Sequence, residues 1–225
     1  MPKVFLGVGH GGTDSGAIGN GFKEKDLNLS IALACNNVLV NHGVTVMMSR
    51  TKDENDSVTE EIKECNAFKP DLAVDIHNNA GGGDGAEAFY CHLGGKGKTL
   101  AENILNEITK TGQNSRGTKV RVNSSGKDYY AFIRETAAPA VIVECAFMDN
   151  SVDIQILNTV DRQTAMGTAI AKGILRTLGI PFVSTKTIYK VQVGAYESKE
   201  NALITQWMLE NYGFNAIVVE AKVTN

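Results

Sequence analysis

Two histidines of the sequence stand where strands are expected to end. His10 follows an apolar stretch and lies among Gly9, Gly11 and Gly12, while His77 follows a second apolar stretch. In a parallel α/β sheet, ligands gather at the carboxyl ends of the strands. Both imidazoles are therefore candidates for one shared site.

Two carboxylates extend this pair to a set that suits metal chemistry. Glu24 precedes an expected helix, and Glu144 lies inside the apolar segment 141–145, where an unpaired carboxylate is costly to bury. Two histidines and one carboxylate form a catalytic zinc set that leaves a fourth position for water, whose pKa zinc lowers to about 7. The other carboxylate can then act as general base and acid. By spacing alone, a glycine turn with histidines that merely cap strand ends is the alternative.

Other chemistries have weaker support. The segment 9–16 matches neither a dinucleotide-binding nor a Walker glycine motif, and Asp14 would repel phosphate. A Gly-x-Ser-x-Gly nucleophile motif is absent. His42 suits a helix end, and His92 suits an exposed strand end.

The pattern of apolar residues predicts the elements that position these groups. Strands are expected at 3–8, 44–49, 71–77, 86–92 and 139–145, with short strands at 120–122 and 129–133. Helices are expected from a cap at Asp26 to His42, and at 57–68, 100–111 and 161–178. This alternation predicts an α/β fold, a three-layer sandwich whose mixed, mostly parallel sheet is flanked by helices.

A smaller unit is expected after this domain. The catalytic domain spans 1–180, and a linker at 181–187 leads to a β-α-β unit at 188–225. Its predicted elements are a strand at 188–195, a helix from Ser198 to Tyr212 and a strand at 214–221.

Composition narrows the classes of function. The 225 residues carry a net charge of −3, so the basic footprint typical of nucleic-acid binding is not expected. The sequence contains no run of 18 apolar residues, so membrane insertion is not expected. The apolar stretch 4–8 is too short for a signal-peptide core, so synthesis in the cytoplasm without a signal peptide is expected. The four cysteines form no Cys-x-x-Cys pair and are expected to be reduced.

Five segments together resemble the zinc-dependent N-acetylmuramoyl-L-alanine amidases of the amidase-3 type. They lie, in the family's order, at 9–12, 24–29, 49–51, 76–80 and 139–144. The likeness is closest to sporulation autolysins and phage endolysins of spore-forming bacteria. It implies that zinc is bound by His10, Glu24 and His77, and that Glu144 is the catalytic glutamate.

The resemblance also implies a substrate. The family hydrolyses the amide between N-acetylmuramic acid and L-alanine of the stem peptide in bacterial peptidoglycan. Asn79 and Gln192 are predicted to bind this substrate. A zinc peptidase that cuts stem peptides and a non-catalytic wall-binding protein are the alternatives. Without a signal peptide, the protein is expected to reach the wall after lysis or through pores.

The sequence departs from the family pattern close to the ligands. Gly7 and Val8 stand where the family has Asp-Pro, and Asp75 stands where it often has Ser. Gly7 removes a carboxylate that could support His10. Asp75 shares a strand face with His77 and is a candidate replacement. Further along, Ala146 stands where Gly is common.

The last segment resembles half of a SPOR domain, a module that binds glycan strands stripped of stem peptides. One half is too short to build a sound core, and its helix carries apolar residues on both sides. We therefore predict a homodimer through residues 188–225. The alternatives are that this unit packs on its own catalytic domain or is a loosely ordered remnant.

Overall fold

A computed structural model describes residues 1–184, 192–214 and 216–220 of the chain. These residues divide into two compact units, Met1–Val183 and Ser184–Asn225. Each unit is described by itself. Within the described residues, no helix is both long and apolar enough to cross a membrane.

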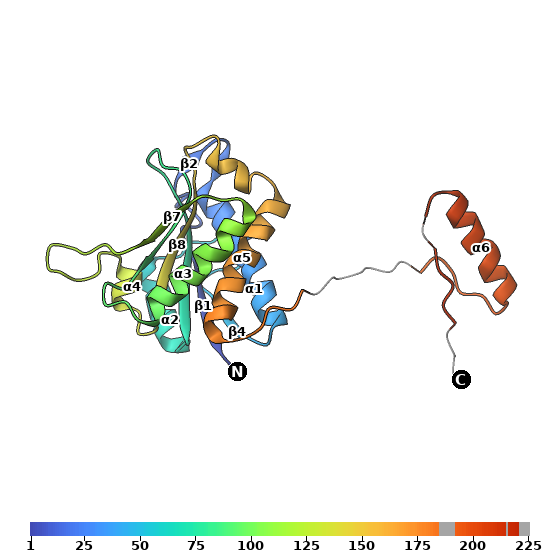
Figure 1. The fold of residues 1–225 in the computed structure, drawn as a ribbon, viewed down its shortest axis with the longest axis horizontal. Coiled ribbons are helices and arrows are strands. Elements are labelled where there is room, and N and C mark those ends of the chain that lie inside the picture. The colour runs from blue at the N-terminus through green and yellow to red at the C-terminus, as the bar shows by residue number, and fades with distance from the viewer. Residues whose placement is uncertain (185–191, 215, 221–225) are drawn as a thin grey trace. The chain divides into compact units, whose positions relative to one another are not determined.

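The first unit is built on a six-stranded sheet (Figure 1). Four strands run parallel at its centre and one edge, whereas β6 is antiparallel to β8 and parallel to β7. In spatial order the strands are β4 (Thr45–Met48), β1 (Lys3–Val8), β5 (Leu72–Asn79), β8 (Ala140–Phe147), β6 (Ala86–Tyr90) and β7 (Ser115–Lys119). The predicted mixed, mostly parallel sheet is confirmed.

Helices cover the two faces of this sheet unequally. One face packs against α1 (Glu24–Asn41), α3 (Lys96–Ile108) and α5 (Val160–Leu178). The other packs only against the shorter helices α2 (Val58–Phe68) and α4 (Ala131–Glu135). Period-2 alternation explains the division, since Val141 and Val143 of β8 join the first core while Ile142 joins the second. The three-layer sandwich is therefore confirmed.

Two predicted strands are wrong. The edge strand is β7, not 120–122, and its polar sequence Ser-Arg-Gly-Thr-Lys lacks the apolar residues that mark a strand. The segment predicted as a strand at 129–133 begins the short helix α4, because Phe132 and Ile133 both enter the core. A short run of adjacent apolar residues is ambiguous in sequence between a strand and a one-turn helix.

Smaller differences concern turns and helix ends. Helix α1 begins at Glu24, so Asp26 lies in its first turn instead of capping it. A hairpin of β2 (Ile18–Gly19) and β3 (Phe22–Lys23) precedes α1, where a loop was expected. The 3-10 helices η1 (Thr109–Thr111) and η2 (Asp153–Leu157) complete the unit.

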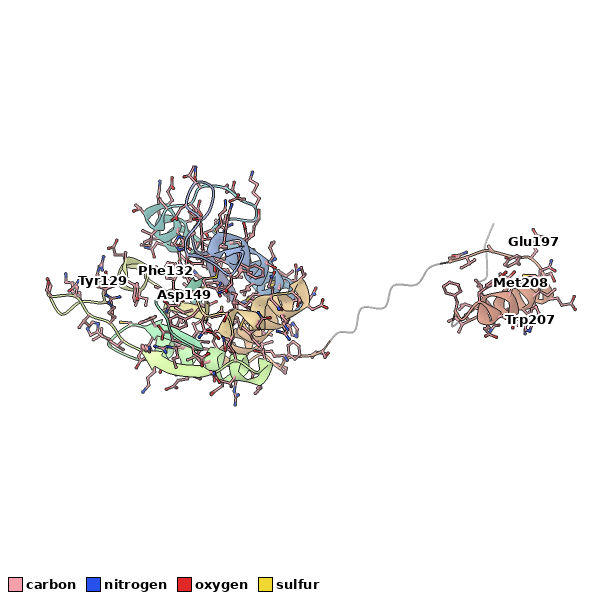
Figure 2. The ribbon with its side chains drawn as sticks, turned by 90° about the horizontal axis from the view of Figure 1, so that it is seen from above. Tyr129, Phe132, Asp149, Glu197, Trp207 and Met208 are labelled. Atoms are coloured by element: carbon pink, nitrogen blue, oxygen red, sulfur yellow. The ribbon has the colours of Figure 1, made fainter. Side chains whose placement is uncertain are left out.

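The second unit contains α6 (Lys199–Asn211), which follows Ser198 and agrees with the predicted helix. No residue of α6 is buried, and the side chains of Trp207 and Met208 lie on it (Figure 2). Of the strands predicted at 188–195 and 214–221, residues 188–191, 215 and 221 lie outside the described residues, and the described parts form no strand. The homodimer through 188–225 stays a prediction.

A buried arginine fastens the loop after β1 to the start of α1. Arg50 is only 2% exposed, although its guanidinium is charged. Its Nε donates to the Val8 carbonyl at 3.0 Å, and Nη2 donates to the carbonyls of Gly9 and Lys25 at 3.3 and 2.7 Å. Nη1 donates to the Lys52 carbonyl at 3.2 Å. One side chain thus joins three segments through four backbone acceptors.

We expect Arg50→Lys to lower the free energy of unfolding by about 3 kcal/mol, because an ammonium cannot reach all four carbonyls and leaves buried acceptors unpaired. Urea denaturation measures the change. Arg176→Lys is the matched control, since the Arg176 side chain is 62% exposed, and it should stay within about 0.5 kcal/mol of the parent. Equal effects of both substitutions would contradict the assignment.

Candidate metal centre and active site

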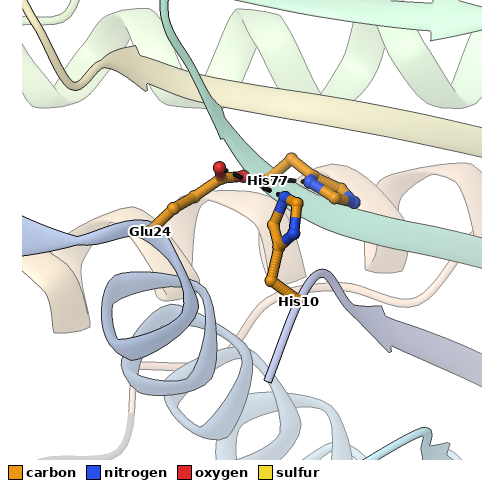
Figure 3. A group of neighbouring side chains, drawn as sticks. All are labelled: His10, Glu24 and His77. Carbon is orange, nitrogen blue, oxygen red and sulfur yellow. Dashed lines mark hydrogen bonds and ion pairs between the residues drawn. The ribbon is translucent and has the colours of Figure 1, made fainter. Parts of the chain in front are cut away.

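Three side chains that are distant in sequence meet at the carboxyl edge of the parallel strands. His10 follows β1, His77 lies near the end of β5, and Glu24 is the first residue of α1 (Figure 3). Their donor atoms all lie within 4.8 Å of one another. His10 Nε2 is 3.2 Å from Glu24 Oε2, and His77 Nδ1 is 3.0 Å from Glu24 Oε1. The structure therefore brings together the three predicted ligands.

Close packing of the backbone makes this meeting feasible. A Cβ atom on Gly9 would lie 2.1 Å from His77 Cε1, so the ring occupies space that only glycine leaves free. His10 itself has a φ of 64°, in the left-handed region that few non-glycine residues adopt. Strain of this kind is commonly held at functional sites.

The Glu24 carboxylate is the centre of this arrangement. It is 4% exposed and accepts backbone N–H groups of Ala17 at 2.8 Å and Asn78 at 3.1 Å. The Asn28 amide donates to it at 3.3 Å. Together with the two imidazoles, these donors supply the partners that a buried carboxylate requires.

Two further carboxylates fix the orientation of the histidine rings. Asp14 Oδ2 lies 2.8 Å from His10 Nδ1, and Asp75 Oδ2 lies 3.2 Å from His77 Nε2. A histidine that binds a metal typically donates its other ring N–H to such a partner. His10 Nε2 and His77 Nδ1 are thereby left to face Glu24, where the three groups could hold a metal ion. The donor set and its support fit a zinc ion with an open coordination position.

Hydrogen bonds and charge interactions shift the pKa values of Glu24, His10 and His77. Burial would raise the pKa of Glu24, but hydrogen bonds with His10 and His77 hold it far below its usual range. The hydrogen bond with Glu24 raises the pKa of His10. Burial would lower the pKa of His77, yet Asp75 and Glu24 raise it well above its ordinary value. The protonation of each of the two histidines and of Glu24 therefore depends on the charge of the others.

Asp75 lies beside Gly7 and contacts His77. Gly7 of β1 and Asp75 of β5 are register partners, so their side-chain positions lie on the same face. A Cβ on Gly7 would meet Asp75 Oδ1 at 2.7 Å and Glu61 Oε1 at 2.1 Å. The two acids therefore fill the space above Gly7, and Asp75 supports His77 instead of His10.

Glu144 lies directly beside His77. The two residues are register partners on β8 and β5, so their side chains leave the same face about 4.8 Å apart. Burial raises the pKa of Glu144 to about 7. A carboxyl group with a pKa near neutrality can accept and later release a proton. The base role of Glu144 stays a prediction.

Asn79 is the last residue of β5, two residues after His77, and it contacts Glu87. Its amide donates to Glu87 Oε1 at 3.0 Å, while Glu87 Oε2 pairs with Arg116 at 2.7 Å and also with Lys119. Burial would raise the pKa of Glu87, but these cations lower it below its ordinary value. Glu87 is the register partner of Glu144, so Asn79 borders the site.

Gln192 is exposed in the second unit, where its amide contacts the Gly194 carbonyl at 3.4 Å. The roles of Asn79 and Gln192 in substrate binding stay predictions. The sequence analysis gave no role to Asp14, although a carboxylate four residues from a histidine in a glycine loop was a usable signal. It also missed Arg116 and Lys119, because β7 was not predicted.

The family model of the amidase-3 type, described as N-acetylmuramoyl-L-alanine amidase, matches residues 4–176. The chain belongs to this family. The matched segment contains the six-stranded sheet except for Lys3 at the start of β1, and every residue of the candidate metal centre. Membership in the amidase family therefore rests on the unit that carries the site.

Several amidases are similar to this chain. The amidase CwlM of Bacillus licheniformis is 37% identical over 227 residues, which cover 97% of this chain and 85% of that protein. The sporulation-specific amidase of Bacillus subtilis is 34% identical over 222 residues, with 97% and 85% covered. The catalytic domain of the amidase CwlV from Bacillus (Paenibacillus) polymyxa superposes with a TM-score of 0.72 at 28% identity, covering 80% of this chain and all of that one.

We expect Asp75→Asn to weaken zinc binding by this amidase about 10-fold to 100-fold, because the supporting charge on His77 is lost. Competition with a chromophoric chelator measures the affinity. Asp14→Asn is the matched control at His10, and its effect should be smaller, since the Asp14 side chain is 65% exposed whereas that of Asp75 is 4% exposed. A larger loss in Asp14→Asn would contradict this ranking.

The metal-free amidase should be most stable between about pH 4.5 and about pH 6.5. The lowered pKa of Glu24 means that its stabilising contribution is lost as pH falls below the unfolded value, and the raised pKa values of His10 and His77 mean that theirs is lost as pH rises above the unfolded value. Zinc and protons compete for the histidine nitrogens and the Glu24 carboxylate. The gain in Tm on zinc addition should therefore increase as pH rises and these groups lose their protons.

Calorimetry of chelator-treated and zinc-loaded protein between about pH 3.5 and about pH 8 measures both effects. His77→Gln serves as control and should show a flatter metal-free profile. A zinc-induced gain in Tm that does not change with pH would refute the role of these histidines.

Proposed function

We propose that the protein is a zinc-dependent N-acetylmuramoyl-L-alanine amidase that cleaves the amide between the lactyl group of N-acetylmuramic acid and L-alanine of the stem peptide. One observation carries this proposal: Glu144, with a pKa near 7, is the register partner of His77 within the two-histidine, one-glutamate centre. Membership in the amidase family supports the choice of bond.

A zinc ion held by His10, Glu24 and His77 would supply a Lewis acid that polarises the scissile carbonyl and acidifies the attacking water. Glu144 accepts the proton of that water at a carboxylate oxygen. It then transfers the proton to the nitrogen of the departing L-alanine amine, which leaves as a neutral amine. One carboxyl group therefore serves both steps.

The surroundings of Glu144 suit this cycle. Burial favours the protonated form, whereas the neighbouring His77 favours the ionised form, so neither state is strongly preferred. The adjacent Glu87 is paired with Arg116 and Lys119, which keep it charged and leave Glu144 as the acid that exchanges protons. Asp75 and Asp14 hold the rings of His77 and His10 in place.

Two other functions share parts of this site. A zinc peptidase that cuts stem peptides would use the same ligands, and a wall-binding protein would need no base. The products separate these functions. The proposed amidase releases glycan strands with free lactyl carboxyl groups and peptides with a new L-alanine amino terminus, whereas a peptidase releases shortened peptides.

Glu144→Gln should bind zinc normally but lose at least about 100-fold in rate on purified cell walls, because the amide cannot accept the water proton. Turbidity loss and mass analysis of the released fragments measure rate and product, and metal analysis measures zinc content. Glu102→Gln on the exposed part of α3 is the matched control and should retain full activity. Undiminished activity in Glu144→Gln would overturn the proposed mechanism.

A further inference from the structure

A second cluster of metal-ligating side chains lies at the opposite end of the sheet, where the parallel strands begin. Because β6 runs antiparallel to β8, its carboxyl end points away from Glu144. Cys91 and His92 follow this end directly, and Asp128 reaches them from the segment between β7 and α4. The function proposed above uses none of these three residues.

The three side chains converge as closely as the ligands of the first centre. One donor atom from each lies within 4.8 Å of the other two. His92 Nδ1 is 3.0 Å from Asp128 Oδ2, which matches the separation of 3.0 Å between His77 Nδ1 and Glu24 Oε1. Tetrahedral zinc with bonds of about 2.0–2.1 Å separates such atoms by roughly 3.3 Å, so small side-chain movements would admit an ion.

The backbone fixes this cluster before any ion binds. The His92 N–H donates to Asp128 Oδ1 at 2.8 Å, and Arg134 Nη1 donates to the carbonyls of Asp128 and Tyr129, both at 2.9 Å. Asp128 is 5% exposed, so its carboxylate is placed by packing as well as by hydrogen bonds. Its other oxygen, Oδ2, is the one that faces His92 Nδ1.

The donors and their surroundings define the ligand class. A thiolate, an imidazole and a carboxylate favour zinc or a similar thiophilic cation over magnesium or calcium. Cys91, His92 and Asp128 line a cavity of about 900 Å³, which leaves room for water or a small anion at a fourth position. Lys96 and Arg134 line the same cavity and would favour an anion there.

We propose that Cys91, His92 and Asp128 form a second zinc-class metal site, separate from the catalytic centre. On binding, the Cys91 thiol loses its proton to solvent and a sulfur–metal bond forms without any change of oxidation state. The ion ties the end of β6 to the segment before α4. The ion would be structural, because the carboxyl end of β6 points away from Glu144 and the ion therefore lies outside the catalytic centre.

Cobalt(II) substitution of the full chain tests this site, because the first centre contains no sulfur. The expected result is about two cobalt ions per chain and a near-ultraviolet sulfur-to-cobalt charge-transfer band. Cys91→Ser should lose the band, retain about one ion and keep its activity on cell walls when loaded with zinc.

His42→Ala, which changes a histidine outside both clusters, is the matched control and should keep the band and both ions. A parent protein without the band, or a band that persists in Cys91→Ser, would overturn the proposal. Because the band reports sulfur ligation alone, these outcomes do not depend on whether the first centre is catalytic.

Discussion

The structure depends on the burial of one charged group, the Glu24 carboxylate. Removing a carboxylate from water costs several kcal/mol unless donors replace the lost hydration. Here the donors come from the loop after β1, from β5 and from α1 itself. Segments that are distant in sequence must therefore reach their native positions together before this charge is satisfied. The contacts that satisfy the Glu24 carboxylate also bring the residues of the candidate metal centre together, so they contribute both to folding and to preorganisation of the site.

Gly7 leaves room for two acids from other elements on the face of the sheet that carries His77. In a parallel pair, register partners present side chains to the same face at nearly the same height. Asp75 of β5 is the register partner of Gly7 and lies 3.2 Å from His77, so it places negative charge beside that ligand candidate. Glu61 fills the remaining space above Gly7, and burial beside Asp75 raises the pKa of its carboxyl group well above the usual value. The space beside Gly7 is thus filled by acids of β5 and α2.

Sequence reasoning predicted what depends on local patterns. Apolar runs identified β1, β5 and β8, and the strand-end rule placed His10 and His77 at one edge of the sheet. Glu24 was a candidate from its residue type and position, but only the family resemblance distinguished it as a ligand from Glu144 as the base, because nothing local shows that a helix-initiating acid faces two histidines. The paths of β7 and α4 were not predictable from periodicity, since the charged side chains of β7 find their partner, Glu87, only across the sheet. Likewise, Asp128 joins Cys91 and His92 only after the chain has folded back.

The unequal covering of the sheet bears on how such an enzyme meets an insoluble substrate. His77 and Glu144 leave the sheet on the face that carries only α2 and α4, as the placement of Ala73 and Ile142 in that core shows. A cross-linked polymer cannot diffuse into a deep pocket, so the catalyst must settle on the polymer. A thin layer of helices on the reactive face reduces the steric barrier to that landing.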